Sequence, residues 1–266
     1  MALLITRTIS SLVLVALVTA TLFVDWLSGF VTTACILLAL HEFFTMLEKK
    51  GIGIYKYFGI CIGAVIPLSL IFRFEPTKTW ELLFILLAVL FLIVMQFKRR
   101  QNSGTIVDIS TTLFGILYVS WFGSFLIKLR YLPGGIGLLA SLIIITKLGD
   151  IGAYLVGSRF GKTPLMPRIS PKKSVEGALG GLAFSILGAL LCKDLLSFSY
   201  VQLVFIGVCL NILGQLGDLS ESLMKRDCQV KDSSGIIPGM GGMLDLLDSL
   251  LFTAPVFYFY ISNVLK

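Results

Sequence analysis

The sequence predicts an all-α fold, an integral membrane protein built as a polytopic helical bundle of about nine transmembrane helices. Of its 266 residues, 56% are hydrophobic and only 14% are charged, and its mean hydropathy is +0.94. Soluble domains carry about 25% charged residues. The apolar residues gather in repeated runs of roughly 18 or more, which is the length needed to cross the hydrocarbon of a bilayer.

The helices are expected where these runs occur, at about 8–24, 28–47, 54–73, 79–97, 105–127, 135–157, 175–192, 199–223 and 243–263. Polar, Gly or Pro residues separate them, for example Pro133-Gly134-Gly135 and the long stretch 158–174. The first run follows Arg7, but no small-residue cleavage site stands before a soluble domain, so we expect a membrane helix rather than a signal peptide.

Basic residues in alternate connections predict the orientation of the bundle. With the N-terminus inside, Lys49-Lys50, Lys98-Arg99-Arg100 and the connections 158–174 and 224–242 fall on the same side. Cytoplasmic loops are enriched in Lys and Arg. We therefore expect a multi-pass protein of the cell (inner) membrane whose 158–174 and 224–242 loops face the cytoplasm. The same rule accounts for the net charge of +7, so no nucleic acid partner is expected, although anionic lipid head groups or a nucleotide would also suit it.

The cysteines and the single histidine exclude two kinds of site. The five cysteines form no CxxC pair, so neither a zinc site nor a disulfide framework is indicated. His41 alone cannot build a histidine-based metal site, and we expect it to lie with Glu42 at the membrane interface. Polar groups within the runs lie mainly in the C-terminal part. We therefore expect a hydrophobic N-terminal region, 1–104, and a region 105–266 that carries the chemistry.

The first polar constellation covers residues 147–177. Lys147 and Asp150 are three residues apart and share a helix face. Further on, Ser170-Pro171-Lys172-Lys173-Ser174 opens a helix with Glu176 in its first turn. A helix N-terminus with serine and lysine nearby can bind an anion. The alternative is an ordinary basic loop with a helix cap.

The second constellation is a polar stripe on the run 199–223. Asp218, Glu221, Ser222 and Lys225 fall at positions i, i+3, i+4 and i+7 of a helix that is otherwise apolar. A carboxylate there must be paired, protonated or bound to a cation. Two carboxylates three residues apart repel each other unless a metal or a base lies between them.

The third constellation runs from residue 231 to 249. Its glycines allow the backbone to approach a ligand closely, and backbone amides in such turns can bind anions. Asp245 and Asp248 follow on one helix face. Together with Asp218 they could hold Mg²⁺, which takes a few carboxylates and keeps sites for water and phosphate oxygens. The alternative is a flexible glycine loop followed by two acids at a helix start.

These constellations resemble the phosphatidate cytidylyltransferases, also called CDP-diacylglycerol synthases, over roughly residues 145–250. Two positions depart from the family pattern, since Met240 stands for a histidine and Leu246 for an arginine, and both changes remove a group that can contact phosphate. The matching residues are Ser222, Lys225-Arg226, Lys231-Asp232, Ser234, Pro238, Gly241-Gly242, Asp245 and Asp248, and upstream Asp150 with Ala153-Tyr154, Ser170 to Lys173 with Glu176-Gly177, and Gly217-Asp218 with Glu221-Ser222.

The resemblance implies transfer of a cytidylyl group from CTP to phosphatidate, which releases pyrophosphate and forms CDP-diacylglycerol for phospholipid biosynthesis. The implied cofactor is Mg²⁺, with a second cation left open, and the substrates are CTP and a phosphatidate from the bilayer. Asp150 and Glu221 are expected to lie behind the metal ligands and to orient them. The implied catalytic residues are Asp218, Asp245 and Asp248 as metal ligands with Lys225 and Arg226 on phosphate, and the implied substrate-binding residues are Ser170, Lys172, Lys173, Glu176, Ser222, Lys231, Asp232, Gly241 and Gly242.

Three alternatives stay open. A CTP-dependent polyprenol or phytol kinase would use the same metal chemistry but release CDP. A catalytically impaired homologue is suggested by Met240 and Leu246. A transporter would also carry intramembrane acids, but the charge here lies on one side, with no matching pair in the first half. Small residues around Gly180-Gly181 would allow helices to pair, and with them two copies in a homodimer.

Overall fold

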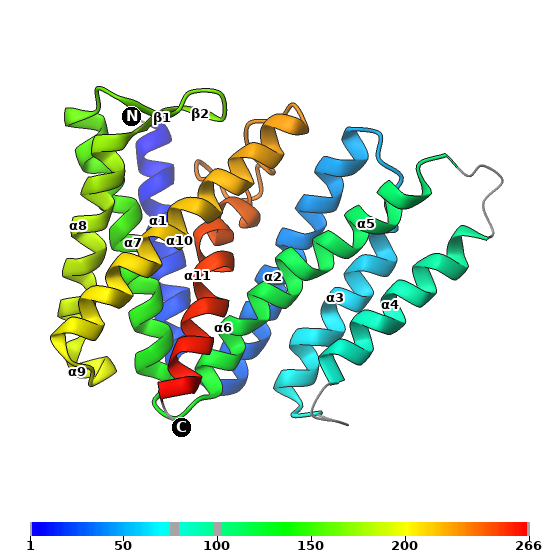
Figure 1. The fold of residues 1–266 in the computed structure, drawn as a ribbon, viewed down its shortest axis with the longest axis horizontal. Helices are drawn as coiled ribbons and strands as arrows, with labels where there is room; N and C mark the ends of the chain where they lie inside the picture. Colours follow the sequence, from blue (N-terminus) through cyan, green and yellow to red (C-terminus); the bar gives the residue numbers. More distant parts are fainter. Residues whose placement is uncertain (1, 75–79, 98–102, 265–266) are drawn as a thin grey trace. The chain divides into compact units, whose positions relative to one another are not determined.

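The computed structural model describes residues 2–74, 80–97 and 103–264, and it confirms the all-α, polytopic prediction (Figure 1). By packing, the chain forms two compact units. Unit 1 holds the residues up to Ile127 together with Cys228–Leu246, and unit 2 holds Lys128–Asp227 together with the residues from Leu247 onward. The boundary predicted after residue 104 concerns where polar groups lie and not how the helices pack, so it stays a prediction.

Unit 1 is built on helices that pack through aromatic side chains and glycines. Phe44 is fully buried, and a Cβ at Gly59 or at Gly115 would lie only 2.6 Å or 2.5 Å from its ring. These two glycines therefore let neighbouring helices close around one phenylalanine. The helices are α1 (Ala2–Phe23), α2 (Asp25–Lys49), α3 (Lys56–Ile71), α4 (Trp80–Gln96), α5 (Thr105–Gly115) and the π-helix η1 (Ile116–Trp121).

Unit 2 contains a tightly packed group of helices with one small hairpin. In Figure 1, α7, α8 and α10 run side by side, and α7 and α8 make the most extensive contact. The elements are α7 (Gly135–Phe160), β1 (Pro164–Met166), β2 (Ser170–Ser174), α8 (Val175–Leu191), α9 (Lys193–Leu196) and α10 (Tyr200–Asp227). Helices α6 (Phe122–Tyr131) and α11 (Met243–Val264) each begin in unit 1 and continue into unit 2.

Glycines explain how closely α7 and α8 approach. A Cβ at Gly152 would lie 2.5 Å from Phe184, and one at Gly181 would lie 3.0 Å from the carbonyl oxygen of Gly149. Small residues of this kind let membrane helices pack backbone to backbone. The small-residue face around Gly180-Gly181 therefore serves contacts within this unit.

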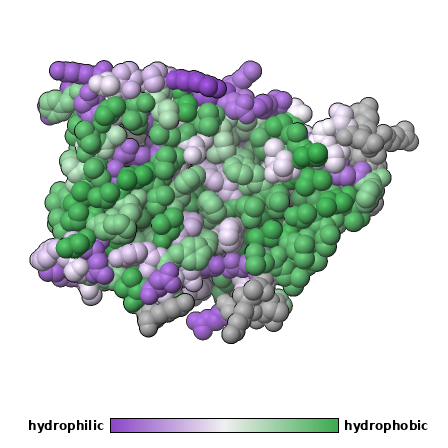
Figure 2. Space-filling model, in the orientation of Figure 1, coloured by the Kyte–Doolittle hydropathy of each residue, from purple (hydrophilic) through white to green (hydrophobic). Residues whose placement is uncertain are grey.

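Within the polar stretch 158–174, α7 continues to Phe160, and Pro164–Met166 and Ser170–Ser174 then pair as an antiparallel hairpin, β1–β2. Figure 2 shows hydrophilic side chains gathered over the hairpin and hydrophobic ones over α8 and α4. Among the residues that the structure describes, five helical segments are long and apolar enough to cross a membrane: Asp25–Lys49, Thr105–Tyr131, Gly135–Phe160, Tyr200–Asp227 and Met243–Val264. Four shorter apolar helices accompany them, so the count of nine spans stays a prediction. The basic triplet Lys98-Arg99-Arg100 lies outside the described residues.

Candidate active site

Three carboxylates converge in unit 2. Asp218 and Glu221 lie one turn apart on α10, and Asp248 lies on α11. One oxygen from each of the three lies within 4.8 Å of the others. Gly217 makes this possible, because a Cβ there would collide with the carbonyl oxygen of Asp248. The polar stripe predicted on α10 therefore meets an acid from another helix, with Glu221 and Asp248 buried and Asp218 partly exposed.

Lysines balance much of this negative charge. Lys173 Nζ lies 2.5 Å from Asp218 Oδ2. Lys225 Nζ lies 2.5 Å from Glu221 Oε2. Both lysines are predicted site residues, and each reaches a different acid of the cluster from a different element, β2 and α10.

A third lysine stands beside the cluster on α7. Lys147 Nζ donates to Asp150 Oδ2 at 3.0 Å and to Ser249 Oγ at 3.1 Å. It also interacts electrostatically with Asp248 and Asp218. The predicted pairing of Lys147 with Asp150 on one helix face is confirmed by this geometry. Each acid of the region thus has a lysine near it, and the cluster of three carboxylates offers the oxygen ligands that a cation would need.

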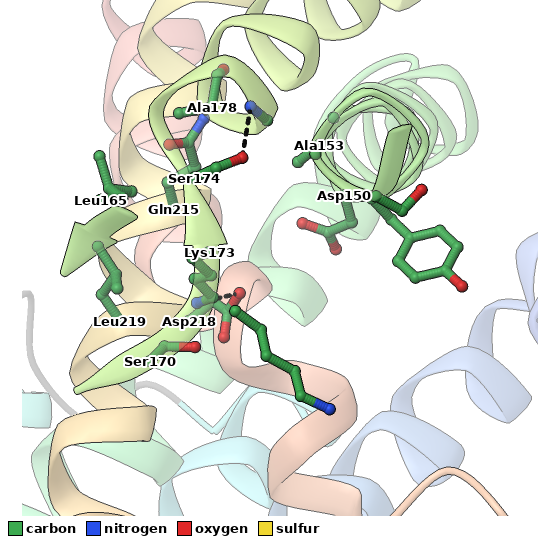
Figure 3. A pocket seen from close by; sticks show the side chains of 16 residues that line it. Asp150, Ala153, Leu165, Ser170, Lys173, Ser174, Ala178, Gln215, Asp218 and Leu219 are labelled. Carbon is green, nitrogen blue, oxygen red and sulfur yellow. Dashed lines mark hydrogen bonds and ion pairs between the residues drawn. The ribbon is translucent and has the colours of Figure 1, made fainter. Parts of the chain in front are cut away.

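A cavity of about 500 Å³ opens next to the carboxylates (Figure 3). It lies between α7, the hairpin, α8 and α10. In Figure 3, Asp150 faces the cavity from α7, whereas Lys173 and Asp218 meet on the opposite side. The predicted residues that line it are Asp150, Ser170, Lys172, Lys173 and Asp218. Two lysines, two acids and a hydroxyl in one recess can bind a phosphorylated molecule with its counter-ion.

The hairpin is held in place by the first turn of α8. Ser174 Oγ accepts a hydrogen bond from Gly177 N at 3.1 Å and so caps the helix. The Glu176 carboxylate accepts from the backbone N–H groups of Lys162, at 3.0 Å, and Thr163. Glu176 thus ties the start of the hairpin to α8, a contact that explains its place in the motif. Its predicted contact with substrate stays a prediction.

The remaining predicted residues lie on or near the loop between α10 and α11. Arg226 Nε donates to the carbonyl oxygen of Ile169 in the hairpin turn, at 3.3 Å. In unit 1, Lys231 and Asp232 are exposed. Asp245 accepts hydrogen bonds from Ser233 and Gly242 in this loop, so its role as a metal ligand stays a prediction. The substrate contacts of Ser222, Gly241 and Gly242 stay predictions as well.

Two charged residues, Glu42 and Lys147, make contacts with distant segments that the sequence did not predict. The sequence predicts Glu42 at the membrane interface, but Glu42 is buried inside the protein, with only 1% of its surface exposed. For Lys147 the sequence predicts only a shared helix face with Asp150, whereas the structure also brings it to Ser249 and close to Asp248. In both cases the available signal was a charged residue inside an apolar run, which is expensive unless a partner meets it.

A recess of lysines beside clustered carboxylates, set among apolar helices, is chemically suited to a membrane enzyme that binds phosphate groups together with a cation. Comparison with known proteins gives the family. The model of the Cytidylyltransferase family matches residues 5–264, and this chain belongs to that family. The resemblance inferred from the motifs is thereby confirmed.

Three curated phosphatidate cytidylyltransferases are similar in sequence to this chain over most of their lengths. A phosphatidate cytidylyltransferase of Synechocystis sp. is 33% identical, over 97% of this chain and 97% of its own. One from Bacillus subtilis is 33% identical over 84% of each chain. One from Thermotoga maritima is 35% identical over 85% of this chain and 84% of its own.

Proposed function

We propose that this protein is a CTP:phosphatidate cytidylyltransferase that makes CDP-diacylglycerol and pyrophosphate for phospholipid biosynthesis. Family membership and the names of its relatives support the reaction class. The observation that carries the proposal is the lysine-lined cavity beside Asp218, because CTP and phosphatidate are both phosphates that need cationic partners.

The acid cluster fits Mg²⁺. Asp218, Glu221 and Asp248 offer hard oxygen ligands from two helices, and two of them are buried, where an uncompensated charge is costly. In this proposal Glu221 is itself a ligand rather than a residue behind the ligands. The ion would neutralise charge on the phosphate oxygens that it contacts. One cation is proposed, and a metal titration would reveal a second.

The chain's own residues would bind and orient the two substrates. A phosphate oxygen of phosphatidate forms a bond to the α-phosphorus of CTP, the bond from that phosphorus to the bridging oxygen breaks, and pyrophosphate leaves with the electron pair. Lys172 and Lys173 would hold phosphates in the cavity. Lys173 can exchange its contact with Asp218 for a phosphate oxygen, since a flexible lysine side chain pairs with either. Such reactions depend mainly on positioning and charge neutralisation.

The apolar helices place the protein in a membrane. The path of the lipid, the side on which the site opens and the number of subunits are proposals. The acyl chains would enter between helices from the bilayer. The hairpin and the 224–242 loop would face the cytoplasm, where CTP is found, in keeping with their basic residues. A homodimer stays a prediction, and the mass of the protein in detergent tests it.

Product analysis tests the proposal. Purified protein in detergent, given phosphatidate, CTP and magnesium, should release pyrophosphate in amounts that match the CDP-diacylglycerol formed. Release of CDP with a polyprenol or similar lipid alcohol would instead identify a CTP-dependent lipid kinase. Folded protein that releases neither product would be the impaired homologue that Met240 and Leu246 suggest, and the proposal would be wrong.

A further inference from the structure

A buried carboxylate in unit 1 gathers hydrogen-bond donors from residues about 200 positions away. Glu42, in the C-terminal half of α2, accepts from Ser233 Oγ at 3.0 Å and from Ser234 Oγ. It also accepts from the backbone N–H groups of Met243, at 3.0 Å, and Leu244, at 2.8 Å. A carboxylate has about four acceptor positions, and the donors around Glu42 match that number.

The two backbone donors belong to the first turn of α11. The first N–H groups of a helix have no partner inside the helix, and a negative charge there is favourable. In most helices a nearby serine or aspartate supplies the acceptor. Here a glutamate on a distant helix supplies it. Glu42 therefore fixes where α11 begins.

A second carboxylate, that of Asp245, binds the same loop. We call Glu42, Asp245 and the groups that donate hydrogen bonds to them the anchor. Asp245 Oδ2 accepts from Ser233 N at 3.1 Å, from Ser233 Oγ at 2.8 Å and from Gly242 N at 2.7 Å. Ser233 Oγ thus lies within hydrogen-bond distance of both Asp245 and Glu42. Its single proton can serve only one of them at a time, which links the two carboxylates through one hydroxyl.

The glycine pair of the motif makes room for this anchor. Gly241 has a φ of +103°, a conformation that side chains disfavour, and a Cβ there would lie 2.7 Å from Asp245 Oδ2. A Cβ at Gly242 would collide with Ser233 Oγ and Glu42 Oε2. Both glycines are thus required by the protein's own carboxylates.

We infer that Glu42 is a positioning residue for the loop 228–242 between α10 and α11, and for the start of α11. This helix carries Asp248 one turn beyond Asp245. The inference deepens the proposed function and rests on it, because it assumes that this loop and helix serve cytidylyl transfer. Glu42 acts through the loop and through α11, and no contact with substrate is assigned to it.

The test compares Glu42→Gln with Glu48→Gln. Glu48 lies on the same helix, has a side chain that is 44% exposed and pairs with Lys56 at 2.9 Å, so its replacement leaves the loop untouched. A glutamine at 42 turns one acceptor into a donor that faces other donors. Ser234→Ala removes one of the four donors to Glu42, together with the acceptor of the Ile236 N–H, and serves as the milder variant should Glu42→Gln fold poorly.

Two readouts separate positioning from general stability. The first is kcat and KM for CTP, measured per amount of folded protein. The second is the rate of trypsin cleavage after Lys231, an exposed residue within the loop. This measurement does not depend on the enzymatic activity of the protein. We expect Glu42→Gln to lower kcat by about 100-fold, as small displacements of reacting groups do, with a smaller change in KM. It should also speed cleavage after Lys231 about tenfold or more, in line with a loop that opens locally. Ser234→Ala should fall between this variant and the wild type on both readouts.

The inference is overturned if kcat per folded protein and the cleavage rate of Glu42→Gln both match Glu48→Gln, or if its activity falls only as far as its folded fraction. If Glu42→Gln does not fold, the same comparison is decided by Ser234→Ala. Failure of the proposed function looks different. In that case the wild type and Glu48→Gln would both release no pyrophosphate, and the cleavage rates would still report on the anchor.

Discussion

Replacing Asp248 by asparagine should separate two effects of the acid cluster on stability. Without a cation the clustered charges destabilise the fold, and with a bound cation they stabilise it. Two unit charges 4.8 Å apart repel each other by about 3.5 kcal/mol at an effective dielectric constant of 20. Asp248 has two such neighbours. Water reaches the side chain of Asp218, which is 37% exposed, so that repulsion is the weaker of the two. Lys147 supplies the opposing attraction.

Lys173 and Lys225 weaken both repulsions, but the burial of the Asp248 carboxylate remains, so Asp248→Asn without magnesium should unfold at the same temperature as the wild type or higher. With magnesium the order should reverse. Binding at a hundred times Kd stabilises a protein by about 2.7 kcal/mol. At about 2–4 °C per kcal/mol for a chain of this size, the wild type should gain roughly 5–10 °C. Asp248→Asn should gain less than half of that.

The assay is thermal unfolding in detergent across a magnesium titration, without substrates. Asp194→Asn is the matched control, because Asp194 is an exposed acid of α9 outside the cluster, and it should respond like the wild type. The reasoning fails if magnesium raises the unfolding temperature of Asp248→Asn as much as that of the control. It also fails if the variant is the least stable of the three without magnesium.

Three further predictions concern neighbouring contacts. Lys173→Met should raise the KM for CTP by about 10–100-fold, the value of one or two charge-assisted hydrogen bonds, and an unchanged KM in steady-state assays would count against its phosphate role. Glu221→Gln should cost about 3–5 kcal/mol of unfolding free energy because the buried ion pair with Lys225 is broken, whereas adding Lys225→Met should restore stability but not activity; a double variant as unstable as the single one would contradict this. Gly152→Ala should cost about 1–3 kcal/mol by overpacking, while Gly235→Ala, where nothing lies within 4 Å, should leave the unfolding temperature unchanged, and equal unfolding temperatures would refute the packing argument.

Hydropathy predicted the helices well because long apolar runs have few other ways to fold. The runs expected at 135–157, 175–192 and 243–263 match α7, α8 and α11 to within a few residues. The hairpin at Pro164–Ser174 was not foreseen, since its prolines indicate only a stiff loop. Its shape depends on bonds from Glu176 and on contact with α8, which are tertiary interactions.

The site was predicted unevenly for a similar reason. Spacing along one helix places Asp218 and Glu221 together, and the structure agrees. Spacing cannot show that Gly217 brings Asp248 against them, nor that Asp245 turns its carboxylate toward Ser233. Contacts between distant segments depend on how helices pack, and a single sequence carries little information on that.

The central claim is that the carboxylate cluster and its cavity transfer a cytidylyl group, and isotope placement tests it most directly. CTP labelled with ³²P at either the α or the γ phosphate would be supplied with phosphatidate and magnesium to the wild type, Asp218→Asn and Asp194→Asn. The account predicts that α label enters the lipid with the wild type and Asp194→Asn and falls by at least about 100-fold with Asp218→Asn, as expected when a group that stabilises transferred charge is lost. Entry of γ label into lipid, or full transfer by folded Asp218→Asn, would contradict it.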